Sequence, residues 1–144
     1  MLANFGVPRQ LRIDGVPVGE LLDPPDGGSE RPAGSCIVVV VTDAPLGTHE
    51  LTRLARRAGL GLARTGSVAH HGSGEIFVAV STTQAEGPKP DMDALFAAVV
   101  ESTEEAVLNA LWAAAETDGR EGRIARALPH EPVLELLRWA GRLD

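Results

Sequence analysis

A hydroxyl residue lies where an open, glycine- and proline-rich stretch meets the most apolar run of the chain. Ser35 follows Gly34, and Ile37–Val41 are five successive β-branched residues, which is typical of a buried strand. If the Gly34–Ser35 bond were cut, Ser35 would begin a chain with a free α-amino group, whose ordinary pKa is about 7.7–8.0. Such an amine acts as the general base for the hydroxyl of its own residue, so this chemistry requires no histidine.

The same residues have a simpler interpretation, in which Ser35 only begins a core strand. A serine hydrolase of the usual kind needs a nucleophile elbow of the form Gly-x-Ser-x-Gly, and this sequence contains none. The residues by themselves therefore leave both interpretations open.

Other motifs in the chain point less clearly to chemistry. The glycine pairs Gly59–Gly61 and Gly72–Gly74 lack the spacing of nucleotide-binding loops. His70 and His71 are adjacent in a loop, where their side chains point to opposite sides, and neither has a helix-spaced partner for a metal. We therefore expect neither a cofactor nor a metal ion. Four arginines between Arg53 and Arg64 are expected to form a solvated helix face.

Composition places the chain among globular proteins and argues against two classes of partner. The 144 residues, of which 44% are hydrophobic and 23% charged, suit one domain. A net charge of −7 and only 3% aromatic residues argue against binding to nucleic acid or to an anionic membrane. The single cysteine, Cys36, excludes an internal disulfide and fits a cytoplasmic protein.

The elements that must position Ser35 follow from hydrophobic periodicity. Two buried strands are predicted over 35–42 and 75–82, each buried on both faces. Helices are predicted from an N-cap at Thr48 to about Arg64, from Asp91 or Asp93 up to Thr117, and from His130 or Pro132 onward. The second helix is expected to be buried on more than one side. A hairpin is predicted around Asp14–Gly15, and two strands make a thin sheet for this much helix.

Several long stretches resemble the DmpA-type aminopeptidases, a family that includes L-aminopeptidase/D-esterases and β-peptidyl aminopeptidases. The similar stretches are 3–6, 35–46, 54–67, 72–77, 103–111 and 127–129. The resemblance implies an α+β fold that is part of a four-layer αββα sandwich, similar to that of N-terminal nucleophile hydrolases. It also implies a precursor that cuts itself at Gly34–Ser35.

The resemblance assigns roles to individual residues of this chain. Ser35 matches the nucleophile, and Ser73 and Glu75 match the residues that complete its hydrogen-bonded group. Asn4 matches an oxyanion-hole amide, a role that contributes roughly 3–4 kcal/mol to transition-state stabilisation.

The resemblance also implies an organisation into three segments. Residues 1–22 correspond to the tail of the larger chain, 23–34 to the processing linker and 35–144 to the smaller catalytic chain. The family's longer N-terminal segment is missing, and we expect it to be a partner of this chain. The full-length form is expected to be a homo-oligomer that binds short peptides, amides or esters.

The expected function is that of a self-processing serine aminopeptidase or amidase, which removes N-terminal residues from such substrates. One alternative is a truncated and catalytically inactive fragment of such an enzyme. Another is an acyltransferase of the ornithine acetyltransferase type, although those enzymes use a threonine nucleophile where this chain has Ser35.

Overall fold

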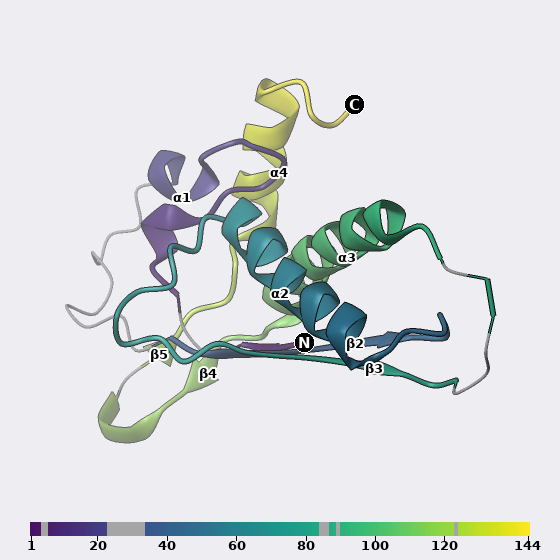
Figure 1. Cartoon of the computed structure of the whole chain (residues 1–144). Helices are drawn as coiled ribbons and strands as arrows, with labels where there is room; N and C mark the ends of the chain where they lie inside the picture. Colours follow the sequence, from purple (N-terminus) through teal and green to yellow (C-terminus); the bar gives the residue numbers. More distant parts are fainter. Residues whose placement is uncertain (4–5, 23–33, 84–86, 89, 123) are drawn as a thin grey trace.

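A three-stranded sheet is the frame of the molecule (Figure 1). The computed structural model describes residues 1–3, 6–22, 34–83, 87–88, 90–122 and 124–144. The strands lie in the order β1 (Leu2–Ala3), β2 (Cys36–Thr42) and β3 (Ile76–Ser81). β2 and β3 are parallel, with Ile37 beside Ile76, and β1 is antiparallel to β2. Both strands predicted from the apolar runs are confirmed; each begins one residue later than expected, and β3 also ends one residue earlier.

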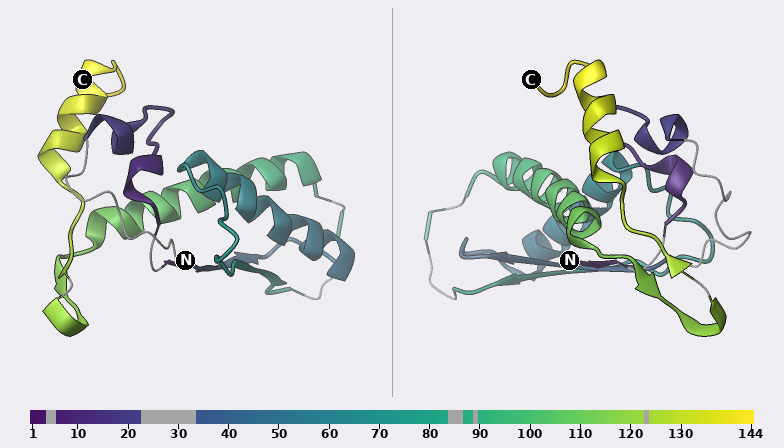
Figure 2. Two further views of the ribbon diagram at one scale, coloured as in Figure 1. Left: turned by 90° about the vertical axis from the view of Figure 1, so that its left-hand side faces the viewer. Right: turned by 180° about the vertical axis from the view of Figure 1, so that it is seen from behind.

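Two helices cover one face of this sheet (Figures 1 and 2). α2 (Thr48–Arg64) connects the parallel strands β2 and β3, and α3 (Met92–Ala113) packs beside α2. Parallel strands need such a crossover, because a tight turn cannot join them. The core between helices and sheet is formed by Cys36, Val38, Leu54, Ala58, Phe96 and Val99.

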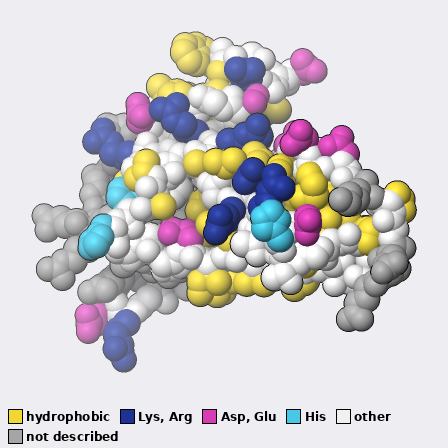
Figure 3. Space-filling view, in the orientation of Figure 1, with side chains coloured by type: hydrophobic (Ala, Val, Ile, Leu, Met, Phe, Trp, Pro, Cys, Tyr) yellow, Lys and Arg dark blue, Asp and Glu magenta, His cyan; other side chains and the backbone are white. Residues whose placement is uncertain are grey.

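The opposite face of the sheet is bare within the described residues, which corrects the prediction of strands buried on both sides. Six β-branched side chains of this face are each at least 41% exposed: Ile37, Val39, Val41, Ile76, Val78 and Val80. Figure 3 shows hydrophobic side chains along the lower edge of the molecule, where Figure 1 places the sheet. A β-branched run indicates that both faces suit burial, but covering the second face requires a further layer.

α3 is likewise buried on one side only, which corrects a second prediction. Its buried residues are Phe96, Val99, Thr103 and Val107, whereas Leu111 and the alanines of the last turn are exposed. The helix begins after Asp91, whose carboxylate accepts hydrogen bonds from the backbone N–H groups of Asp93 and Ala94. The predicted cap at Thr48 is wrong, because Gly47 precedes α2 and no side chain caps that helix.

A second hydrophobic cluster lies beside the sheet and joins the two ends of the chain. It packs α1 (Val18–Leu21) against α4 (His130–Trp139), with Val18 and Val133 completely buried, and η1 (Pro8–Gln10) lies beside α1. The predicted turn at Asp14–Gly15 is present, with φ of 48° and 77°. The hairpin is limited to one bridge between Ile13 and Val16, because helical turns flank it in place of strands.

The remaining elements form a small projection at the end of α3. β4 (Thr117–Asp118) pairs with β5 (Ile124–Ala125), and η2 (Arg120–Gly122) lies between them. The Trp112 ring near the end of α3 stacks on His130 at the start of α4, with 4.4 Å between ring centroids. Within the described ranges, no helix has both the length and the apolar character that a membrane crossing needs.

Candidate active site

The predicted nucleophile lies at the end of the sheet where β2 and β3 both begin. Because the two strands run in parallel with Ile37 beside Ile76, the residues that precede them meet at the same edge. The Gly74 backbone N–H donates a hydrogen bond of 3.2 Å to Ser35 Oγ. Ser35 is exposed there, whereas Gly34 is buried. The bond between an enclosed glycine and an accessible hydroxyl is the predicted cleavage point.

The two residues predicted to support Ser35 flank Gly74. The Ser73 hydroxyl donates a hydrogen bond to Glu75 Oε1, and both side chains are half-buried. The structure therefore brings Ser35, Ser73 and Glu75 to one edge of the sheet, although 38 residues or more separate Ser35 from the other two in sequence. Asn4, the predicted oxyanion-hole amide, lies outside the described residues, as does the predicted linker apart from Gly34.

The loop that carries Ser73 is fixed to the N-terminal part of the chain. The Arg12 N–H donates to the Thr65 carbonyl over 3.0 Å, and His70 Nε2 lies 3.0 Å from Gln10 Oε1. Gly66 has a φ of +99°, and a Cβ there would lie 1.7 Å from the Gln10 carbonyl oxygen, so only glycine allows this approach. These contacts hold the loop against Gln10 and Arg12, a connection that the sequence did not reveal.

The two glycine pairs do not have the geometry of a phosphate-binding loop. Gly59 and Gly61 lie inside α2, and Gly72–Gly74 precede a strand where a phosphate loop would precede a helix. Among the described residues, no three His, Cys, Asp or Glu side chains gather as a metal-binding group.

Three of the four arginines of α2, Arg53, Arg56 and Arg64, are exposed as predicted, and Arg57 is half-buried. The guanidinium groups of Arg53 and Arg57 lie over the Phe96 ring, at 5.1 Å and 4.1 Å from its centroid. Arg64 forms a salt bridge of 3.0 Å with Glu104 of α3. In Figure 3 basic side chains gather over the middle of this face. The arginines thus help to hold α2 against α3.

Cys36 lies directly after the predicted nucleophile and is buried beneath the helices. Burial raises the pKa of the Cys36 thiol above its ordinary 9.0, and the nearby Glu75 carboxyl adds to this effect. The thiol therefore stays protonated near neutral pH, which keeps it from competing with Ser35 as a nucleophile.

The raised pKa of Cys36 predicts a loss of stability in alkaline solution. Above pH 9 the thiol ionises in the unfolded chain before it does so in the folded chain, so the unfolded state binds fewer protons. The free energy of unfolding should then fall by about 1.4 kcal/mol per pH unit from this group. Urea unfolding at several pH values between 7 and 10.5 measures the slope. Cys36→Ala should flatten it by this amount, and an equally steep slope in that variant would contradict the assignment.

The chain is similar to curated and structurally solved enzymes over nearly its whole length. It is 37% identical to the β-peptidyl aminopeptidase BapA of Sphingosinicella microcystinivorans, over 97% of this chain and 42% of that protein. The L-aminopeptidase D-Ala-esterase/amidase of Ochrobactrum anthropi is 36% identical, with a TM-score of 0.81 over 98% of this chain and 42% of that one. A Burkholderia β-aminopeptidase is 34% identical, with a TM-score of 0.73 over 96% of this chain and 42% of that one.

These matches settle the fold and the family. The Ochrobactrum enzyme is a variant of the Ntn hydrolase fold, so the present chain has part of that fold. The chain spans about two fifths of the length of each relative. The model of peptidase family S58 matches residues 1–125. The edge of the sheet that carries Ser35, Ser73 and Glu75 therefore lies within a member of that family, and we conclude that the chain belongs to peptidase family S58.

Proposed function

We propose that this chain is the C-terminal part of a self-processing serine aminopeptidase that acts on short peptides, amides or esters. The observation that carries the proposal is the hydrogen bond from Gly74 to Ser35 Oγ, because Gly74 lies between the paired side chains of Ser73 and Glu75. Family membership and the aminopeptidase names of the relatives support the same activity.

The proposed processing step is an acyl shift within the chain. Ser35 Oγ attacks the Gly34 carbonyl carbon, the Gly34–Ser35 C–N bond breaks, and the hydroxyl proton ends on the new α-amine. Water then hydrolyses the resulting ester and releases Ser35 as the first residue of a separate chain. The exposure of Ser35 leaves room for that water.

In the proposed hydrolysis, Ser35 Oγ attacks the carbonyl of the substrate's N-terminal residue, and its own amine takes the hydroxyl proton. The amine returns the proton to the leaving group and afterwards activates water to release the acyl group. Ser73 and Glu75 would hold the nucleophile and its amine in place. Asn4 would stabilise the oxyanion, in the role that its family position suggests.

Mass spectrometry of the purified 144-residue chain tests the proposal. Two fragments that separate between Gly34 and Ser35 would support it. A chain that stays intact at neutral pH, both alone and with the N-terminal part of a relative added, would favour the inactive-fragment alternative instead.

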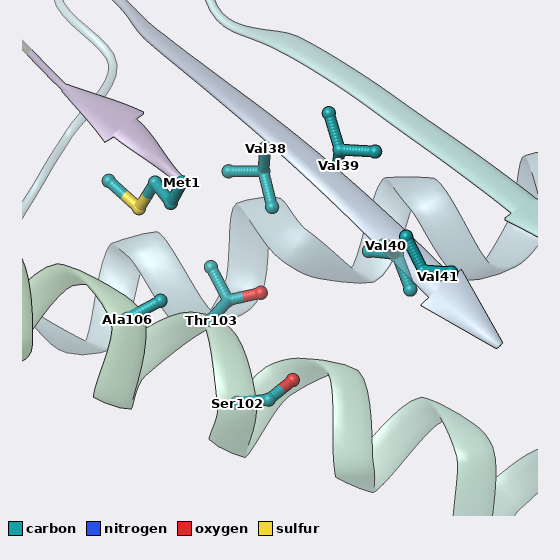
Figure 4. Close-up of a pocket in the computed structure, with 8 residues that line it drawn as sticks. All are labelled: Met1, Val38, Val39, Val40, Val41, Ser102, Thr103 and Ala106. Carbon is teal, nitrogen blue, oxygen red and sulfur yellow. The ribbon is translucent and has the colours of Figure 1, made fainter.

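We also propose that the N-terminal segment found in longer relatives covers the bare face of the sheet. Contiguous exposed apolar surface of this kind is uncommon on monomeric proteins and typically marks an interface. The edge of β2 beside β1 supports the same partner. Within the described residues, β1 pairs with β2 only at Cys36 and Ile37. Beyond that pairing, a pocket opens between β2 and α3; Figure 4 shows its lining, which is Met1, Val38, Val39, Val40, Val41, Ser102, Thr103 and Ala106.

The register indicates how such a segment would enter. β1 runs antiparallel to β2, so residues ahead of Met1 would continue along Val39–Thr42 and pass over this pocket. A strand in that place would satisfy the backbone groups at the edge, and further strands would cover the valines and isoleucines beneath. The homo-oligomeric assembly implied by the resemblance stays a prediction.

This docking proposal predicts that a charge placed on the bare face of the sheet prevents association with the N-terminal segment, whereas a charge placed on α2 does not. The N-terminal part of the Sphingosinicella BapA, supplied as a separate chain, should co-elute with the 144-residue chain in gel filtration. Val39→Glu places a carboxylate on the bare face and should abolish co-elution, since an unpaired charge is costly to bury. Leu60→Glu on the outer side of α2, where Leu60 is 56% exposed, is the matched control and should leave co-elution intact. Equal behaviour of the two variants would contradict the docking face.

A further inference from the structure

The backbone N–H of Gly74 donates a hydrogen bond to the oxygen of the predicted nucleophile. It lies 3.2 Å from Ser35 Oγ, and it comes from the residue between Ser73 and Glu75. Its direction is set by the backbone, because Ser73 N–H donates to the His70 carbonyl on one side and β3 begins two residues later on the other. A side-chain donor would have rotamers to lose, whereas this donor is fixed by the fold.

We propose that the Gly74 N–H holds Ser35 Oγ in position for attack and stabilises the charge that develops on it, an inference that rests on the proposed function. While Oγ forms its bond to the Gly34 carbonyl carbon, the hydroxyl proton leaves toward the nitrogen of the breaking C–N bond. Oγ carries partial negative charge during this transfer. A hydrogen bond to an oxygen that bears charge is shorter and stronger than one to a neutral hydroxyl, so the donor favours the transition state over the ground state.

The local geometry explains why position 74 also limits access to the nucleophile. The φ of Gly74 lies outside the left-handed region, so its backbone does not itself require glycine. A Cβ at this position would lie 3.5 Å from Ser35 Oγ, which is an ordinary contact. Alanine therefore fits and keeps the N–H donor, while a larger side chain would cover the hydroxyl from this side.

Replacing the Gly74 amide by an ester in the full 144-residue chain, with glycolic acid at position 74, removes the donor alone. We expect cleavage at Gly34–Ser35 to slow at least tenfold. The rise of the rate with pH should also move to higher pH, because without its donor the hydroxyl loses its proton less readily. Gly74→Ala keeps the donor and should cut at least tenfold faster than Gly74→Pro, which lacks it.

Ala69 offers a matched control in the same loop. Its N–H donates to Ser67 Oγ over 3.3 Å, which is a bond of the same kind away from the cleavage point. Lactic acid at position 69 removes that bond and should leave the cleavage rate within twofold, with the same pH profile.

The outcomes separate this inference from the proposed function. If the unsubstituted chain cuts and the position-74 ester cuts equally fast with the same pH profile, the inference is overturned and the function stands. If the unsubstituted chain does not cut, either alone or with the N-terminal part of a relative added, the proposed function fails and the inference fails with it.

A measurement without cleavage covers the case in which the ester chain does not fold. In Ser35→Ala, the Gly74 amide proton should move upfield in NMR spectra and exchange faster with solvent, while the Ala69 amide proton stays unchanged. A Gly74 signal that does not respond would show that the donor is not bound to Ser35, and the inference would be wrong.

Discussion

Ser35→Ala is expected to leave the chain uncut between Gly34 and Ser35 and to remove any aminopeptidase activity of the processed protein. Alanine lacks the oxygen that attacks the Gly34 carbonyl, so the acyl shift has no nucleophile. Loss of a catalytic serine typically reduces turnover by about 10⁴-fold to 10⁶-fold, because the remaining groups stabilise only a part of the transition state. Mass spectrometry follows the cut, and release of the leaving group from an aminoacyl p-nitroanilide follows hydrolysis.

Ser67→Ala is the matched control for this substitution. Ser67 lies in the loop that leads to Ser73, and its hydroxyl oxygen accepts a local hydrogen bond from the Ala69 N–H. This variant should cut and turn over like the unsubstituted chain. Cleavage that persists in Ser35→Ala, or activity lost equally in both variants, would exclude Ser35 as the nucleophile.

Gly61→Ala is expected to destabilise the fold by about 2 kcal/mol, despite the usual gain of about 1 kcal/mol when alanine replaces glycine within a helix. Gly61 lies where α2 crosses α3, and a Cβ there would come within 2.4 Å of the Val100 carbonyl oxygen and 2.7 Å of Thr103 Cβ. A backbone carbonyl cannot rotate away, so the helices must separate and loosen the core between them. The melting temperature should fall by roughly 5 °C.

Gly59→Ala is the same substitution two residues earlier in the same helix, with the opposite expected sign. The nearest atom to a Cβ at Gly59 is a ring carbon of Phe77 at 3.4 Å, which is part of a side chain that can adjust. The gain in helix propensity should then stabilise the fold by up to about 1 kcal/mol. Urea unfolding midpoints of the two variants measure the difference. Equal midpoints would mean that α2 and α3 do not approach as closely as described.

The two parallel strands and the helices that cover them could be predicted because their signals are local, whereas β1 was not predicted. The β-branched run from Ile37 to Val41 and the apolar periodicity of α2 depend only on neighbouring residues, and both elements are confirmed within a few residues. Burial was predicted less well, since it depends on what lies opposite. The bare face of β2 and β3 has the composition of a covered face, and its cover is not among the described residues.

The candidate site, like the fold, was only partly predictable from the sequence. The position of Ser35 before a β-branched strand left two interpretations open, and its role as nucleophile, like the roles of Ser73 and Glu75, was assigned through the family resemblance. Nothing local to the residues near 74 indicates a partner almost forty positions earlier. The parallel register of β2 and β3 creates that meeting, and register is decided by the crossover helix and the core beneath it.

The sequence by itself determined the strand that follows Ser35, the helices α2 and α3, and the position of a hydroxyl residue directly before that strand. Only the tertiary structure decided that Gly74 donates to that hydroxyl, and that one face of the sheet stays uncovered within the described residues. The physical reason is the range of the interactions. Periodicity and capping act over a few residues, while a shared strand edge and a covered face depend on segments that folding alone brings together.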